Sequence, residues 1–134
     1  MENVVVVYAS TTGNTEAMAN AVAEGAGVSA VRADEADAGA VKAASAIALG
    51  SPAMGSEELE DSMESFFSSI ESSLSGKKIA LFGSYDWGEG EWLRSWEERA
   101  KAAGAVVTGS LKAHLSPESD DLEACKALGR GLLG

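Results

Sequence analysis

Short apolar runs alternate with amphipathic segments five times along the 134-residue chain. Unbroken apolar runs are typical of strands buried on both faces, whereas apolar residues three and four positions apart are typical of helices. The runs predict strands at residues 4–9, 28–32, 45–50, 78–83 and 106–113, the last with an interruption at Gly109. Each run is followed by a helical segment, which predicts an α/β fold with a parallel sheet covered by helices on both faces.

The helical segments differ in the strength of their apolar pattern. The first carries Met18, Ala21, Val22 and Gly25, and a weak acidic helix is expected around residues 37–42. The strongest stripe is Leu59, Met63, Phe66, Phe67, Ile70 and Leu74, and the next helix carries Trp92, Leu93, Trp96, Ala100 and Ala103 as core residues. The last helix carries Leu122, Cys125, Leu128 and Leu132, with Ser116-Pro117 as its expected cap. No linker interrupts the pattern, so we expect a single domain over residues 1–134.

Charge narrows the choice of partners. The chain has 10 Lys and Arg against 21 Asp and Glu, a net charge of -11 at pH 7. Nucleic acid and anionic membranes need clustered positive charge, so neither is an expected partner, and a protein partner would offer a basic face. The alternative for most of these acids is an ordinary solvated surface. No apolar run is long enough to span a membrane and no basic residue precedes Val4 as in a secretory signal, so we expect a cytoplasmic protein.

One cysteine and one histidine leave little scope for thiol chemistry. Cys125 cannot form an internal disulfide and gives no metal-ligand spacing. A catalytic pair with His114 would lack a third, orienting group. The simpler interpretation is a buried small side chain at Cys125 and a surface imidazole at His114.

Candidate chemistry lies in the loops that follow the first, third and fourth strands, because open parallel sheets bind ligands beyond the carboxyl ends of their strands. The first loop, STTGNT at residues 10–15, joins a buried strand to a helix N-terminus that attracts anions. No Lys or Arg occurs from residue 1 to 31, and neither a nucleotide-hydrolysing nor a dinucleotide glycine motif is present. A monophosphate such as that of FMN fits this loop. The alternative is that its hydroxyls only cap the helix.

The other two loops offer surfaces for a planar ring. SPAMGSEELED at residues 51–61 presents Met54 beside Gly55, although Ser56 and the acids after it could simply start a helix. SYDWGEGEW at residues 84–92 presents Tyr85 and Trp87 among glycines that permit close approach. A ring whose phosphate lies in the first loop could be sandwiched between these two.

Together, STTGNTEAMAN, SPAMGSEELED, GSYDWGEGEW and the C-terminal CKALG resemble the short-chain, anaerobe-type flavodoxins over essentially the whole chain. The resemblance implies a doubly wound five-stranded parallel sheet of order 2-1-3-4-5. It also implies a monomeric, low-potential electron-transfer protein that carries one electron at a time on non-covalently bound FMN between redox partner proteins, and not an enzyme.

The resemblance also implies which residues hold FMN. They are Ser10, Thr11, Thr12, Gly13, Asn14 and Thr15 at the phosphate, then Ser51, Pro52, Ala53, Met54, Gly55, Ser56 and Glu58, and finally Ser84, Tyr85, Asp86, Trp87 and Gly88. Met54 would cover the inner face of the ring and Trp87 the outer face. The carbonyl of Gly55 would turn toward the ring after one-electron reduction, and Glu58 would hold the flavin edge partly through its backbone N–H.

Two positions depart from the pattern of the close relatives, which usually have glycine where this chain has Thr11 and Asp86. Aspartate accepts a left-handed backbone more readily than most residues do, so Asp86 can replace glycine at this position, and its contact with the flavin is left open. The acids near the site, six of them with no base between residues 43 and 76, would disfavour an anionic reduced flavin and attract basic redox partners.

Two other functions remain as alternatives. A flavodoxin-like FMN-dependent NAD(P)H:quinone reductase would share the fold and the cofactor, but it needs room over the flavin that Trp87 would occupy. A signalling receiver domain would need an acidic cluster after the first strand and an aspartate at the end of the third, where this chain has ASTTG and GSPAM.

Overall fold

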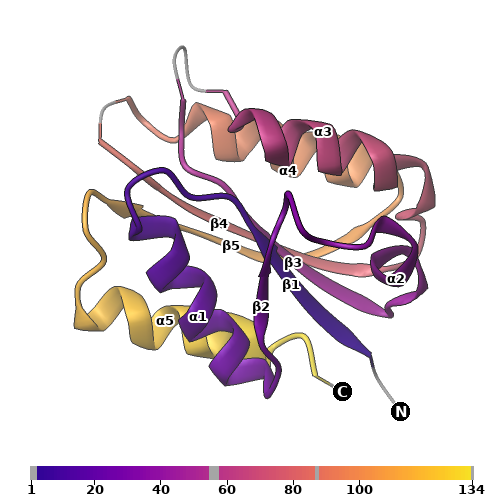
Figure 1. Ribbon diagram of the computed structural model, residues 1–134, viewed down its shortest axis with the longest axis horizontal. Coiled ribbons are helices and arrows are strands. Elements are labelled where there is room, and N and C mark those ends of the chain that lie inside the picture. The colour runs from indigo at the N-terminus through magenta and orange to yellow at the C-terminus, as the bar shows by residue number, and fades with distance from the viewer. Residues whose placement is uncertain (1–2, 55–57, 87, 134) are drawn as a thin grey trace.

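The computed structural model describes residues 3–54, 58–86 and 88–133, and it shows a central sheet with helices on both faces (Figure 1). The described elements are β1 Val4–Tyr8, α1 Asn14–Ala26, β2 Ala30–Arg32, α2 Ala38–Ala43, β3 Ala46–Gly50, α3 Asp61–Ile70, the 3₁₀ turn η1 Glu71–Ser73, β4 Lys78–Tyr85, α4 Glu91–Ala102, β5 Val106–His114 and α5 Ser119–Arg130. All four strand pairs are parallel, in the order β2-β1-β3-β4-β5. The predicted fold class and strand order are confirmed.

The second strand begins later than predicted because the end of α1 takes the residues before it. Gly27 has a left-handed φ of 75°, and its N–H donates to the carbonyl of Glu24. The N–H of Val28 donates to the carbonyl of Ala23. Val28 therefore completes the helix cap, and pairing with β1 starts only at Ala30.

The last helix also begins later than predicted. Glu118 is its N-cap, and a capping box joins the side chains of Glu118 and Asp121 to backbone N–H groups at the helix start. The Asp121 carboxylate accepts the Glu118 N–H at 2.9 Å. The expected cap at Ser116-Pro117 is therefore wrong, because the acidic pair satisfies the first N–H groups of the helix two residues further on.

Strands β4 and β5 both extend beyond the predicted ends, to the pair Tyr85 and His114. Their register shifts once, because Ile79 pairs with Val107 while Ala80 pairs with Gly109. Thr108 is the extra residue, so the predicted interruption near Gly109 is confirmed as a bulge. The long β4–β5 pair carries the chain to the edge of the sheet where the three candidate loops lie.

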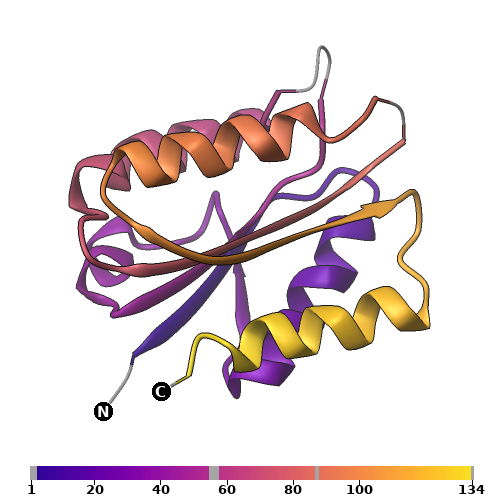
Figure 2. The ribbon, with the colours of Figure 1, turned by 180° about the vertical axis from the view of Figure 1, so that it is seen from behind.

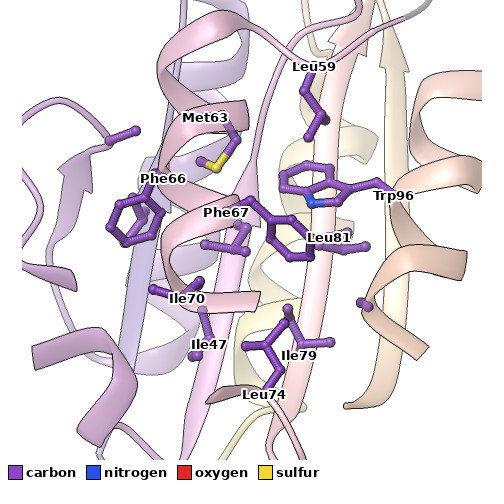
Figure 3. Packing of buried hydrophobic residues seen from close by; sticks show 14 of the residues in the cluster. Ile47, Leu59, Met63, Phe66, Phe67, Ile70, Leu74, Ile79, Leu81 and Trp96 are labelled. Atoms are coloured by element: carbon purple, nitrogen blue, oxygen red, sulfur yellow. The ribbon is translucent and has the colours of Figure 1, made fainter. Parts of the chain in front are cut away.

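Helices α2, α3 and α4 cover one face of the sheet, which we call the aromatic face. Its core includes Phe66, Phe67, Trp92 and Trp96. Figure 3 shows Phe67 and Trp96 packed over Ile79 and Leu81 of β4. The two rings meet edge to face with centroids 5.9 Å apart. Trp92 and Trp96 are buried, as the sequence predicts.

Helices α1 and α5 cover the opposite face, which we call the small-residue face (Figures 1 and 2). Its core is rich in alanine and valine, with Tyr8, Met18, Phe82 and Leu132 as the larger side chains. A Cβ added to Gly25 would lie 2.0 Å from the Lys126 carbonyl oxygen, and one added to Gly129 would lie 2.0 Å from that of Val22. The two helix backbones therefore touch at their crossing.

Cys125 is fully buried on this face, as predicted. Burial, and secondly the charge of Asp121, raises the pKa of its thiol to about 11. The thiolate, which is the reactive form, is therefore scarce at neutral pH. None of the described helices is both long and apolar enough to cross a membrane.

Candidate cofactor-binding site

A pocket of about 210 Å³ lies beyond the carboxyl ends of β1, β3, β4 and β5. These strand ends lie on the left of Figure 1. The residues that line it are Thr11, Thr12, Asn14, Pro52, Ala53, Met54, Ser84, Tyr85, Asp86 and Leu115. The structure thus brings together the three loops that the sequence singled out, and it adds Leu115 from a fourth.

In the first loop, the hydroxyls divide between two tasks. Ser10 Oγ accepts the N–H groups of Gly13 and Glu16, at 3.1 and 3.3 Å, so the capping alternative is correct for Ser10. Gly13 has a φ of 93° and turns the chain into α1. Thr11 and Thr12 are exposed and line the pocket beside the N-terminus of α1, whose first N–H groups and positive dipole end favour an anion.

The Thr15 side chain makes a contact that the sequence did not predict, and its role at the phosphate stays a prediction. Its side chain is buried, with 1% exposure, and its Oγ1 lies 3.0 Å from Ser84 Oγ. The Ser84 N–H donates to the same oxygen at 3.3 Å. In this structure the Thr15 hydroxyl therefore joins α1 to β4 instead of facing the pocket, while Ser84 does line the pocket.

The second loop is closed by a short antiparallel bridge. The N–H of Met54 donates to the carbonyl of Glu58, and the N–H of Glu58 donates to the carbonyl of Met54, both at 2.8 Å. Met54 is 37% exposed and lines the pocket. The Glu58 N–H, which we expected to hold the flavin edge, donates to the Met54 carbonyl in this structure, and its role at the flavin edge stays a prediction. Gly55 and Ser56 lie outside the described residues.

Ser51 anchors the start of the second loop through hydrogen bonds. It is fully buried, its Oγ accepts the Glu60 N–H at 2.9 Å, and its carbonyl accepts Trp92 Nε1–H at 3.0 Å. A Cβ on Gly83 would lie 1.9 Å from that carbonyl oxygen. Ser51 therefore supports the loop, while Pro52 and Ala53 above it reach the pocket.

The third loop begins at Tyr85, whose half-buried ring lines the pocket. The ring centroid lies 5.7 Å from that of Trp92 and 5.1 Å from that of His114. Gly88 has a φ of 92°. Trp87, which the resemblance places over the flavin, lies outside the described residues.

Asp86 does not adopt a left-handed backbone. Its carbonyl oxygen lies 3.1 Å from His114 Nε2. Within the described ranges, the non-glycine residue with a positive φ is Leu115, at 61°. Leu115 N–H donates to the Tyr85 carbonyl at 2.7 Å, and its side chain, 50% exposed, lines the pocket.

Leu115 is the site residue that the sequence did not indicate. The expected loops followed the first, third and fourth strands, whereas Leu115 follows the fifth. The local sequence HLSP, residues 114–117, carries no motif that marks Leu115 as a ligand-binding residue. Only its position, directly after the carboxyl end of a strand that neighbours β4, could have placed it at the site.

The lining is polar at one end and apolar at the other. Thr11, Thr12 and Asn14 offer neutral hydrogen-bond donors beside a helix N-terminus, and Ala53, Met54 and Tyr85 offer apolar and aromatic surface. This division fits a phosphate joined to a planar ring system, so the residues present suit FMN. In the part of the chain that the structure describes, no three His, Cys, Asp or Glu side chains form a metal-binding group.

The chain is similar in sequence and fold to known proteins. The flavodoxin family model matches residues 6–129. The chain is 48% identical over 130 residues to the flavodoxin of Megasphaera elsdenii, covering 92% of this chain and 93% of that one. It is 43% identical over 108 residues to the flavodoxin of Clostridium beijerinckii, covering 76% and 78% of the two chains. The solution structure of two-electron reduced Megasphaera elsdenii flavodoxin superposes with a TM-score of 0.88 at 44% identity, over 96% of this chain and 97% of that one.

Proposed function

The chain belongs to the flavodoxin family, whose members carry electrons on bound FMN, and from this premise we propose that the pocket between its three loops is where this chain holds the flavin. The protein is an electron carrier and not an enzyme. The observation that supports the location is the division of one pocket into a hydroxyl-rich end and an aromatic end.

At the polar end, Thr11, Thr12 and Asn14 would donate to the phosphate. Ser10 supports them by fixing the turn before α1, because its Oγ holds the N–H groups of Gly13 and Glu16. The N-terminus of α1 adds backbone N–H groups and the favourable end of its dipole. No Lys or Arg lines the pocket among the described residues, so neutral donors would hold the dianion.

At the apolar end, Met54, Tyr85 and Leu115 would bound the ring, with Trp87 proposed over its outer face. The flavin supplies one-electron chemistry when it is bound. The protein excludes water from one side and fixes the ring against β4. Gly55, which lies between the bridged residues Met54 and Glu58 in the sequence, is proposed to turn its carbonyl toward the ring after one-electron reduction.

Acidic side chains set the charge around this end of the molecule. Glu58, Asp86 and Glu89 are exposed beside the second and third loops. Each such charge raises the energy of an anionic reduced flavin by about 0.4 kcal/mol at roughly 10 Å in water. Several together favour a low second potential.

The protein transfers electrons to and from redox partner proteins. The chain's net charge of -11 supports docking faces that are basic on those partners. We further propose a single domain that works as a cytoplasmic monomer. Rates of electron transfer would then fall as ionic strength rises.

The test is a stepwise anaerobic reduction of the purified protein mixed with one equivalent of FMN. We expect tight binding and a long-wavelength absorbance band near half reduction. Absence of FMN binding would refute the proposed site and cofactor, and steady-state NAD(P)H oxidation by the protein alone would favour the reductase.

A pair of threonine variants locates the phosphate end. Thr12→Val removes a hydroxyl that lines the pocket, and we expect about fivefold weaker FMN binding, the ratio for one net hydrogen bond. Thr108→Val changes a hydroxyl on the bulge of β5 and serves as the control. Equal FMN affinities for the two variants would argue against the assigned phosphate position.

A further inference from the structure

Two basic side chains of β5 reach over the third loop and contact its backbone. Lys112 Nζ donates to the carbonyl of Glu89 at 3.1 Å. His114 Nε2 lies 3.1 Å from the carbonyl oxygen of Asp86. The two contacts bracket Trp87 and Gly88 in the sequence, one on each side. We call Lys112 and His114 the β5 clamp.

The two clamp residues also lie around Tyr85. Since they are two positions apart on one strand, they point to the same side of the sheet. The Lys112 ammonium lies 5.9 Å from the centroid of the Tyr85 ring, and the His114 ring centroid lies 5.1 Å from it. Tyr85 lines the pocket, so the clamp is one side chain away from the proposed flavin position.

Gly90 makes room for the lysine. Its φ is 89°, and an added Cβ would lie 2.8 Å from Lys112 Nζ and 2.9 Å from Lys112 Cδ. The stem of Lys112 therefore lies across Gly90, the residue that precedes α4. The contact to Glu89 is thus part of a fitted arrangement at the end of the third loop.

The contact between His114 and Asp86 constrains the imidazole. A carbonyl oxygen can only accept a hydrogen bond, so Nε2 must carry a hydrogen in the bonded state. The protonated ring would make a charge-assisted bond, which is stronger than the neutral one. The titratable and charged groups that face His114 are Tyr85 of β4, Asp86 of the third loop and Lys112 on its own strand.

We propose that Lys112 and His114 are positioning residues that hold the third loop against the flavin and so set the affinity for FMN and part of its pH dependence. The inference rests on the proposed function, because it takes the pocket as the FMN site. A protonated imidazole makes a stronger hydrogen bond to the Asp86 carbonyl than a neutral one, which favours bound FMN at acid pH.

The experiment measures the FMN dissociation constant, by quenching of flavin fluorescence, from about pH 5.5 to about pH 8.5, a range that spans the usual titration of histidine. Lys112→Met and His114→Phe each remove a donor, and His114→Phe keeps a ring beside Tyr85. We expect each to weaken FMN binding about fivefold at neutral pH, and the double variant more than either.

Two further variants separate the mechanism from simpler causes. Lys101→Gln removes the same charge from an exposed lysine that pairs with Glu97 on α4, so it controls for net charge. His114→Gln keeps an N–H donor that does not titrate. We expect its affinity to match the wild type at the alkaline end and to fall about threefold behind it at the acid end.

The titration of the flavin itself cancels in the ratio of the dissociation constants of the His114→Gln variant and the wild type, because both proteins bind the same ligand. Amide hydrogen exchange at Gly88 and Glu89 in the FMN-free protein gives a second readout, and we expect it to be faster in the double variant. If the wild type binds FMN but the clamp variants match Lys101→Gln at every pH, the clamp is refuted and the proposed function stands. If the wild type binds no FMN, the proposed function itself fails.

Discussion

The two faces of the sheet are packed on opposite principles. The aromatic face fills the space between α3, α4 and the strands with Phe66, Phe67, Trp92 and Trp96. The small-residue face is rich in alanines and valines, and it lets the backbones of α1 and α5 touch at Gly25 and Gly129. The first face depends on large side chains being present, and the α1–α5 crossing on the second depends on side chains being absent.

This difference places opposite limits on substitution. A close-packed interior loses stability when a large side chain is removed, because a cavity remains, and also when an atom is added where no space exists. The aromatic face is therefore sensitive to truncation and the small-residue face to enlargement. Both faces converge on the same pocket, since α1 begins at its polar end and Trp92 of α4 supports Tyr85 at its apolar end.

Truncation of the aromatic face gives the largest expected effect. Phe67 is fully buried between Trp96 and Arg99, whose guanidinium lies 4.8 Å from the ring centroid. Phe67→Ala should lower the free energy of unfolding by about 3–5 kcal/mol in urea titrations. Leu133→Ala, at an exposed position, is the control and should change it by less than about 0.5 kcal/mol. Equal losses in the two variants would show that the aromatic face is not the stabilising core.

Enlargement of the small-residue face comes next. Gly25→Ala should lower the free energy of unfolding by about 1–3 kcal/mol, because the new Cβ meets the Lys126 backbone. The sign is informative, since helix propensity alone predicts a gain of about 1 kcal/mol.

The matched control is Gly131→Ala. Its φ is -66°, and the nearest atom to an added Cβ is 3.4 Å away. It should be neutral or stabilising when measured by the same urea titration. A stabilised Gly25→Ala protein would mean that α1 and α5 are less tightly packed than this structure shows.

The buried hydroxyl pair behind the pocket tests the small-residue face at its polar end. Thr15→Val keeps the shape of the side chain but leaves Ser84 without its partner, so a loss of about 1–2 kcal/mol is expected from thermal or urea unfolding. Thr11→Val, on the exposed side of the same loop, should leave unfolding unchanged in the FMN-free protein. A Thr15→Val protein as stable as the wild type would contradict the structural role assigned to that hydroxyl.

The smallest expected effect concerns the ion pair on the outside of the aromatic face. Arg99 donates two hydrogen bonds to Glu64, at 2.8 and 3.0 Å, and one to Glu71 at 3.2 Å. These side chains are about one third to one half exposed, so screening by water limits the contribution to about 1 kcal/mol. Arg99→Met should cost about that much at neutral pH.

The pH dependence of this cost has a defined sign. Arg99, chiefly through its hydrogen bonds, holds the pKa of Glu64 below its usual value. A carboxylate with a lowered pKa stabilises the folded state above its unfolded pKa, and this contribution is lost as the pH falls through the folded value. The wild type and Arg99→Met should therefore converge in acid, and a difference that persists unchanged there would assign the effect to the contact with Phe67.

Strands β1, β3 and β4 were predictable because each is buried on both faces and reads as an unbroken apolar run, as Ile47 to Leu49 does. The ends of the helices and strands were less predictable from the sequence, because local hydrogen bonds determine where each element begins and stops. The cap at Gly27 takes Val28 from the second strand, and the Glu118–Asp121 box starts the last helix. The end of an element depends on which of several neighbouring caps forms, and the spacing of apolar residues does not predict this.

The site divides in the same way. Position after a strand located the three loops, and Thr11, Met54 and Tyr85 do line one pocket. The pairing of Thr15 with Ser84 joins residues that are 69 positions apart, so only the folded chain reveals it. Leu115 reaches the pocket through a left-handed backbone, a conformation that leucine rarely adopts and that the sequence therefore does not predict.

The Met54–Glu58 bridge should allow residues 55–57 to be substituted without disturbing the rest of the fold. Two hydrogen bonds of 2.8 Å fix both ends of a stem, and β3 and α3 are anchored independently on either side of it. A library randomised at positions 55–57 would then vary the chain between two fixed ends without changing the packing of the sheet. Such a library would turn one natural carrier into a graded series of redox proteins that share a single scaffold.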